Sequence, residues 1–304
     1  MLSPEKREQF QKEPAQAIEA DIKAFVSTSP LNRMPSTREL AVFDEPLVRF
    51  ADGDDSLYNQ YKTIIDAVHL TPREALAQGL DRAIEELPAR ISVISWVLPI
   101  TGETRRSNRL EKKVPSRRWS HTRYYGEEFN DTVRKHVVEV LTEVGALAVA
   151  PMLQPYFRTM SNEQVGFFSN WSERHTAYAA GHGTFSLSDG FITKRGIAHR
   201  CGSVVTDLPL PPSGRTYTDH LSNCLFYVDG SCKACIARCP AGAITEQGHD
   251  KRQCSRYLRE IGYLPVSDYY DDEKSVYGCG LCQTDVPCEY RIPAKVEKGR
   301  KGAD

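Results

Sequence analysis

Apolar residues recur at helical spacing in several stretches of the chain, and the first of these is Ala15 to Val26. The best-marked helix follows Thr71, because Thr71 can cap it, Pro72 takes its first position and Glu74 completes a capping box. We expect that helix to reach about Glu86. Prolines punctuate the rest of the first seventy residues, which predicts a helical and irregular extension there.

Beyond residue 90 the pattern changes to short apolar runs separated by helical segments. The run from Ile91 to Leu98 predicts a buried strand, and valines at helical intervals predict a helix from about Glu127 to Val144. Further expected elements are strands at 146–152, 191–193 and 202–208, and a helix at 172–180 that stops at Gly181. Strands that alternate with helices in this way predict an α/β layer within an α+β or α/β fold.

Cysteine usage divides the chain near Pro211 to Gly214. Eight of the nine cysteines lie between Cys224 and Cys288, in a segment with few apolar runs. At 304 residues the chain has room for about two domains. We therefore predict an extension over residues 1–70, an α/β domain over 71–213 and a cysteine-rich domain over 214–304, in which bound clusters replace hydrophobic burial.

The cysteine spacing is typical of a protein with two 4Fe–4S clusters. Cys232, Cys235, Cys239 and Pro240 form a C-x2-C-x3-C-P run, and the last cysteine of such a run in bacterial ferredoxins binds the other cluster. Each cluster needs four thiolates, so eight cysteines make two complete sets. We predict a first cysteine set of Cys224, Cys232, Cys235 and Cys288, and a second cysteine set of Cys239, Cys254, Cys279 and Cys282.

Two departures from the usual spacing fall in the first set. Asp229 and Val286 stand where the usual runs have cysteine, and the nearest thiols are Cys224 and Cys288. A carboxylate ligand at Asp229 is the alternative for this set. Structural zinc is the alternative for the whole pattern, but the Cys-Pro ending and the total of eight thiols favour iron.

Charge and hydropathy exclude several other classes of protein. The 39 basic and 40 acidic residues nearly cancel, which gives no electrostatic footprint for nucleic acid. No apolar run approaches the roughly 20 residues of a membrane span. The charged first residues, Met1 to Arg7, lack the apolar region of a secretory signal. We therefore expect a cytoplasmic protein without disulfides, in which the leftover Cys201 is buried.

An ordered series of motifs precedes the cysteines: Glu173-Arg174, Ala180-Gly181-His182-Gly183, Gly190-Phe191-Ile192-Thr193 and Val205-Thr206-Asp207-Leu208-Pro209-Leu210. Together with the double-cluster cysteines, this series resembles the epoxyqueuosine reductase and reductive dehalogenase superfamily, of which the chain looks like a divergent member. The match is good from Glu173 to Gln283, weaker from Ile91 to Met152 and absent over the first seventy residues.

The resemblance implies a nitroreductase-like α/β sandwich followed by a ferredoxin-like module, with cobalamin bound beside the nearer cluster. Electrons would pass from an external ferredoxin, flavodoxin or reductase through the clusters to the corrinoid, which reduces a small organic substrate. Gly181 and Gly183 would let the backbone approach the corrin, with His182 and Thr206 as further contacts. The local alternatives are a helix stop for the glycines and a strand end for Thr206.

The resemblance is incomplete at the proton donor. Epoxyqueuosine reductases carry an acidic residue shortly before the Glu-Arg pair, and an ungapped match places Phe167 there, which disfavours epoxyqueuosine as the substrate. The candidate catalytic residues are therefore Tyr156, Tyr178 and His182. A tyrosine pKa near 10 would need lowering by a cation such as Arg174.

Two other functions compete with a corrinoid-dependent reductase. A non-enzymatic electron carrier or reductive activator of a partner enzyme needs the same clusters, and the missing acid at Phe167 favours it. A flavin in the α/β domain is the third hypothesis, since nitroreductase-like folds elsewhere hold flavin. The lack of a phosphate-cradling glycine motif disfavours it.

Overall fold

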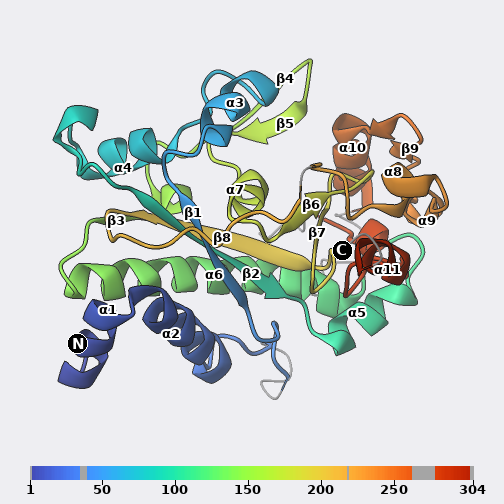
Figure 1. Cartoon of the computed structure of the whole chain (residues 1–304). Coiled ribbons are helices and arrows are strands. Elements are labelled where there is room, and N and C mark those ends of the chain that lie inside the picture. Colours follow the sequence, from blue (N-terminus) through green and yellow to red (C-terminus); the bar gives the residue numbers. More distant parts are fainter. Residues whose placement is uncertain (1, 35–39, 218, 262–277, 302–304) are drawn as a thin grey trace.

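The computed structural model describes residues 2–34, 40–217, 219–261 and 278–301. Its centre is a four-stranded sheet with helices on both faces, and a smaller cysteine-rich unit lies at one end of the sheet (Figure 1). None of the helices within the described ranges combines the length and the apolar character that crossing a membrane requires.

The strands of the sheet and of the hairpins beside it are β1 (Leu47–Asp52), β2 (Ser92–Pro99), β3 (Ala148–Val149), β4 (Thr159–Asn162), β5 (Gly166–Ser169), β6 (Gly183–Phe185), β7 (Phe191–Thr193) and β8 (His199–Thr206). The helices around them are α1 (Pro4–Lys12), α2 (Pro14–Thr28), α3 (Leu57–Ile64), α4 (Pro72–Leu80), α5 (Gly102–Arg109), α6 (Arg117–Glu143) and α7 (Glu173–Ala179). The cysteine-rich unit contains α8 (Leu225–Asp229), α9 (Ala234–Arg238), β9 (Ile244–Thr245), β10 (Gly248–His249), α10 (Lys251–Ile261) and α11 (Ala294–Lys301).

The central sheet has the order β1-β2-β8-β3, and each neighbouring pair is antiparallel. Because β2 and β3 both run antiparallel to β8, they run parallel to each other across it. The predicted strand–helix–strand order is therefore confirmed for β2, α6 and β3. The prediction that these strands form an α/β layer is wrong, because the antiparallel strand β8 lies between them. The fold is α+β, which is the other half of the prediction.

The first seventy residues contribute to this sheet. Helix α2 confirms the helical spacing from Ala15 to Val26. Strand β1 was not expected, and it pairs with β2 along six residues from Leu47 to Asp52. The prediction of irregular structure is wrong for these residues. The alternation of apolar and polar residues in β1 is too short to predict a strand, and hydrogen bonds to β2 hold this edge segment extended. The division into domains at residues 70 and 213 stays a prediction.

Helix boundaries follow the local signals at some ends only. The capping box of Thr71 and Glu74 is present, but α4 ends at Leu80 rather than near Glu86, where Asp81 takes a left-handed φ of 54°. Helix α6 begins ten residues before the predicted start and is capped by Ser116. Its first turns bury polar side chains, including Ser120 and Thr122, so apolar periodicity does not reveal them.

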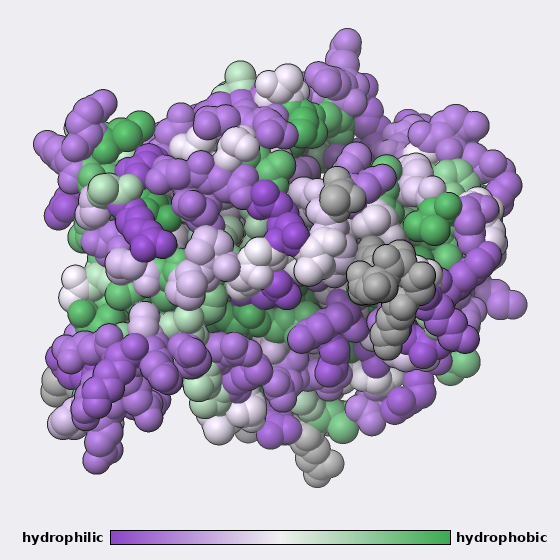
Figure 2. Space-filling model, viewed as in Figure 1, coloured by the Kyte–Doolittle hydropathy of each residue, from purple (hydrophilic) through white to green (hydrophobic). Residues whose placement is uncertain are grey.

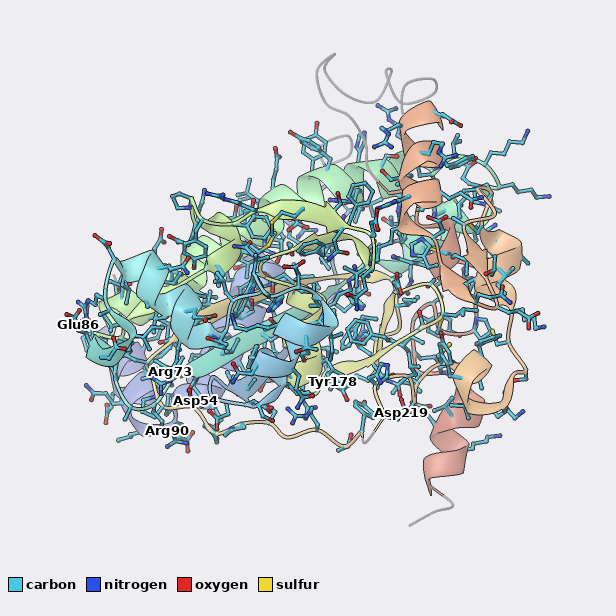
Figure 3. The ribbon with its side chains drawn as sticks, turned by 90° about the horizontal axis from the view of Figure 1, so that it is seen from above. Asp54, Arg73, Glu86, Arg90, Tyr178 and Asp219 are labelled. Atoms are coloured by element: carbon cyan, nitrogen blue, oxygen red, sulfur yellow. The ribbon has the colours of Figure 1, made fainter. Side chains whose placement is uncertain are left out.

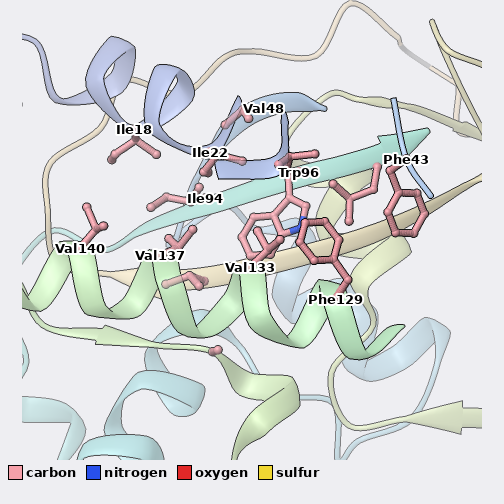
Figure 4. Close-up of a cluster of buried hydrophobic side chains, with 14 of the residues drawn as sticks. Ile18, Ile22, Phe43, Val48, Ile94, Trp96, Phe129, Val133, Val137 and Val140 are labelled. Atoms are coloured by element: carbon pink, nitrogen blue, oxygen red, sulfur yellow. The ribbon is translucent and has the colours of Figure 1, made fainter. Parts of the chain in front are cut away.

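Alternate residues of β2 form the core on the two faces of the sheet. Ile94 and Trp96 meet Phe129 and Val133 of α6 on one face, where α2 completes the cluster (Figure 4). Val93 packs against residues of α3, α4 and α7 on the other face. The molecular face in Figure 2 is mainly hydrophilic, with apolar residues scattered over it. The sheet thus has a packed core on both faces, and the cysteine-rich unit lies at its end.

The cysteine-rich unit has little secondary structure with which to build a core. Its strands β9 and β10 span two residues each and, among the residues that the structure describes, pair with one another alone. Its apolar cluster joins Ile244, Val286 and Ile292 to Leu187 and Ile192 of the β6–β7 hairpin, with several cysteines packed against it. This is the C-terminal cysteine-rich region that the sequence predicts.

Candidate functional site

A hollow in the cysteine-rich unit contains the first cysteine set. Cys224, Cys232, Cys235 and Cys288 line it, together with Cys282 of the second set. The other walls are mostly apolar and are formed by Ile192, Leu225, Phe226, Val286, Pro287 and Pro293, with Ser186 and Ser188. The structure thus brings together, around one hollow, four thiols that lie up to 64 residues apart in the sequence.

The pKa values of these thiols reflect the same grouping. Burial raises the pKa of Cys235 to about 11, and the neighbouring Cys224 and Cys232 add to the effect. Burial also raises the pKa of Cys288, again helped by the other three thiols of its set. Thiols in such surroundings keep their protons unless a bound cation replaces them.

The second set is gathered in the same way. Burial raises the pKa of Cys254 to about 11, and Cys279 and Cys239 contribute. The pKa of Cys282 is raised by burial and by the other three members of its set, and also by Cys235 of the first set. Cys282 therefore lies where the two sets meet.

The assignment of these cysteines as cluster ligands stays a prediction. No three His, Cys, Asp or Glu side chains within the described ranges converge closely enough to hold a single metal ion. The alternative ligand, Asp229, forms an ion pair with Lys295 at 2.5 Å. That pair, with hydrogen bonds from Ser231, lowers the pKa of the Asp229 carboxyl to about 2.

Helices α5 and α6 hold the second set against the sheet domain, which here means the described part of the chain from α1 to β8. The Asn108 side-chain amide donates to the carbonyl of Cys279 at 3.2 Å and to the hydroxyl of Thr284 at 3.1 Å. Gly280 has a left-handed φ of 61°, and a Cβ there would lie 2.0 Å from the indole of Trp119 on α6. The turn beside Cys279 therefore requires glycine for its conformation and for its close contact.

The β6–β7 hairpin and the residues after it hold the first set. The Ile197 amide donates to the carbonyl of Cys288 at 2.9 Å. Asp189 lies at the hairpin tip, where His249 of the cysteine-rich unit contacts its carboxylate at 3.2 Å. Burial opposes its ionisation, but His249 and Lys251 together lower the pKa of Asp189 below its usual value. Both cysteine sets are thus fixed to the sheet domain.

The glycine pair that the resemblance assigns to cobalamin meets the chain's own backbone. A Cβ at Gly181, where φ is 80°, would lie 2.2 Å from the carbonyl oxygen of Gly214. A Cβ at Gly183 would lie 2.1 Å from the carbonyl oxygen of Ile192 on the paired strand. The space that each missing side chain would occupy is already filled by the chain's own backbone. The part of this pair in binding a corrin stays a prediction. The local alternative, a helix stop followed by a tight pairing, explains both glycines.

The other predicted cofactor contacts are also enclosed. His182 is 3% exposed, and its Nε2 donates to the carbonyl oxygen of Ser95 at 3.0 Å. Burial lowers the pKa of His182 to about 3, so the ring is neutral near pH 7. Thr206 is fully buried at the end of β8, where its hydroxyl accepts from the Leu208 amide at 3.1 Å.

The candidate tyrosines lie in surroundings that oppose ionisation. The hydroxyl of Tyr156 donates to the carbonyl oxygen of Ala75 at 2.7 Å, and burial raises its pKa. Burial also raises the pKa of Tyr178 on α7, where Arg215 opposes the shift and Asp219 adds to it (Figure 3). Arg174, the cation expected to lower a tyrosine pKa, instead donates from its guanidinium to the carbonyl of Asp189. It is not among the groups that shift the pKa of Tyr156 or Tyr178.

A buried charge network between α6 and α7 was not predicted. The guanidinium of Arg134, fully buried in α6, pairs with Glu127 at 2.9 Å, Asp131 at 2.6 Å and Glu173 at 3.2 Å. It also donates to the carbonyl of Cys201 at 3.2 Å. The Glu173-Arg174 motif was the signal in the sequence that could have indicated this network. Arg134 is a single arginine within a predicted helix, and its position there does not reveal that Glu173 is its partner.

Comparison with curated proteins identifies epoxyqueuosine reductases as relatives. The enzyme from Bacillus anthracis is 32% identical over 121 residues, which are 38% of this chain and 29% of that protein. The enzyme from Vibrio cholerae is 24% identical over 214 residues, which are 68% of this chain and 52% of that protein. The chain spans between 29% and 37% of the length of three of the curated relatives that it matches. No family model matches it.

Solved structures give weaker likenesses. An epoxyqueuosine reductase from Bacillus subtilis aligns with a TM-score of 0.48 and 17% identity, over 93% of this chain and 68% of that one. A catabolic reductive dehalogenase aligns with a TM-score of 0.44 and 12% identity, over 98% of this chain and 40% of that one.

Proposed function

Because this chain is a distant homologue of the epoxyqueuosine reductases, we propose that it is an iron–sulfur oxidoreductase. The cysteine-rich unit holds two 4Fe–4S clusters in this proposal, one on each cysteine set. The observation that carries it is the spatial sorting of eight cysteines into two sets that meet at Cys282.

The residues present fit such clusters. The first set lines an apolar hollow, and its thiols come from three separate segments that the sheet domain fixes in place. Raised pKa values at Cys235 and Cys254 mean that iron must displace protons when it binds. When bound, the clusters supply one-electron transfer at potentials that depend on burial and on hydrogen bonds to sulfur.

The two sets are arranged to serve as one path. Cys282 belongs to the second set but also lines the hollow of the first. The second set rests on α5 and α6, and the first rests on the β6–β7 hairpin. The place of Cys282 beside both sets supports transfer of an electron from one cluster to the other.

The finer proposal is a cobalamin-dependent reductase of a small organic substrate, fed by an external ferredoxin, flavodoxin or reductase. The relationship to epoxyqueuosine reductases and the motif series from Glu173 to Leu210 support it. Gly181, His182 and Gly183 belong to that series, and contact between these residues and a corrin stays a prediction.

Metal analysis and spectroscopy test the proposal. Protein reconstituted anaerobically should contain about eight irons and give the electron paramagnetic resonance signals of two clusters when reduced. Zinc in place of iron would refute it. Titration with cobalamin in its oxidised and reduced states, followed by absorbance, then tests the finer proposal, which fails if neither state binds.

An electron-transfer protein or reductive activator is the second candidate, and a specific observation favours it. Phe167 stands where the family's acid is expected and is 40% exposed on the β4–β5 hairpin. A Cβ at either matched glycine, Gly181 or Gly183, would meet the chain's own backbone. A protein of this kind would hold both clusters, ignore cobalamin and reduce a partner protein while transforming no small molecule itself. Cobalamin-dependent turnover would exclude it.

A further inference from the structure

Glu289, the residue after Cys288, is a buried carboxylate held by α5 of the sheet domain. Its side chain is 1% exposed. The Arg109 guanidinium donates to both of its oxygens at 2.8 Å, and the Arg105 Nε lies 3.5 Å from one of them. A two-point pair of this kind fixes direction as well as distance. Glu289 therefore joins the cysteine-rich unit to α5 at a defined orientation.

The same carboxylate also shapes the loop that carries Cys288. The Asp285 amide donates to the Glu289 carboxylate at 2.8 Å, and Asp285 takes a left-handed φ of 59°. The Glu289 amide donates back to the carbonyl of Val286 at 3.0 Å. These two bonds close residues 285–289 into a compact turn around Cys288.

This turn accounts for the unusual spacing of the first cysteine set. Val286, where the usual run has cysteine, is 8% exposed and packs in the apolar cluster of the unit. Cys288 lies two residues later and reaches the hollow with the other three thiols. Backbone bonds from Ile197 and Ala198 to the carbonyls of Cys288 and Glu289, at 2.9 Å and 3.2 Å, fix the turn from the other side.

We propose that Glu289, through Arg109, is the positioning residue that presents Cys288 to the cluster of the first set. This inference rests on the proposed function. The displaced cysteine reaches its cluster only while the turn is closed, and the turn is closed by a carboxylate that α5 holds in place. Loss of the carboxylate charge leaves Arg109 and Arg105 uncompensated beside the first set, which raises the potential of any cluster retained there.

Five variants test this in the full chain after anaerobic reconstitution. Glu289→Gln and Arg109→Met break the pair from its two sides, and Arg109→Lys keeps the charge. Arg106→Gln is the matched control, because Arg106 forms an exposed pair with Glu103 on the same helix, with side chains 63% and 50% exposed. Cys254→Ala removes a ligand of the second set and identifies the resonance signal of the first.

The wild type and Arg106→Gln should carry the full iron content, and Glu289→Gln and Arg109→Met about half of it. The lost signal should be the one that survives in Cys254→Ala. Arg109→Lys should keep both signals with a shifted potential for the first cluster. The inference would be overturned, and the proposed function left standing, if Glu289→Gln lost both clusters equally or kept the full iron content with unchanged potentials. A wild type that binds no iron would overturn the proposed function with it.

Discussion

Replacement of Arg134 by methionine tests the charge network that joins α6 to α7 and β8. Arg134 is fully buried, and the change removes its contacts with Glu127, Glu173 and the carbonyl of Cys201 while leaving an apolar side chain of similar volume. Breaking a buried ion pair from one side costs about 3–5 kcal/mol, because the remaining charge is left without a partner.

That cost is a large part of the free energy of unfolding of a typical domain, which is about 5–15 kcal/mol. For a chain of 304 residues, it corresponds to a fall in melting temperature of about 5–8 °C. Thermal unfolding followed by circular dichroism measures the shift. Lys135→Met, an exposed charge on the same helix, is the matched control and should melt like the wild type.

The deficit of Arg134→Met should also depend on pH. Burial already raises the pKa of Glu173 above its usual 4.5 while Arg134 opposes the shift, so removal of Arg134 raises that pKa further. A carboxyl group whose pKa is higher in the folded protein stabilises that state fully at pH values below its unfolded-state pKa. This contribution to the free energy of unfolding is lost as pH rises through the folded-state pKa. The deficit should therefore grow from about pH 4 upward, and Glu173→Gln added to the variant should reduce it at pH 7. A deficit that is independent of pH, or below about 1 kcal/mol, would refute the reasoning.

Three further predictions follow from the same contacts. Gly280→Ala should lower the iron content of the second set, because its Cβ would meet the Trp119 indole at 2.0 Å; metal analysis measures the loss. His182→Gln should flatten the decline of stability between pH 6.5 and about 3, where only the unfolded imidazole takes up a proton; denaturant titrations at several pH values measure the slope. Cys201, whose pKa burial raises to about 12, should resist alkylation at neutral pH, as mass spectrometry would show.

Each of these has a clear contrary result. Gly145→Ala, at another left-handed glycine with open space around it, is the control for Gly280→Ala, and equal iron loss in both would point to backbone strain instead of the clash. An unchanged pH slope in His182→Gln would show that His182 titrates normally in the folded protein. Rapid alkylation of Cys201 in the native protein would contradict its burial.

The local signals of the sequence determined much of the predicted framework. The Thr71 capping box, the buried run of β2, the strand Phe191–Thr193 and the helix stop at Gly181 are all present. Each depends on residues within a few positions of one another, so a single sequence suffices to recognise them. The same holds for the cysteine run near Cys235, whose spacing indicated two clusters before any fold was known.

Contacts between distant segments were decided by the tertiary structure alone. Strand β8 lies between β2 and β3, and β1 is held extended by its pairing with β2. The chain's own backbone passes close to the matched glycines, Gly181 and Gly183. The Glu289–Arg109 pair joins residues 180 positions apart. Such pairings leave no periodic trace in either partner, because their energy depends on which surfaces meet once the chain has folded. Residue types therefore indicated which chemistry to expect, and packing between distant segments decided how the residues that would carry it are held.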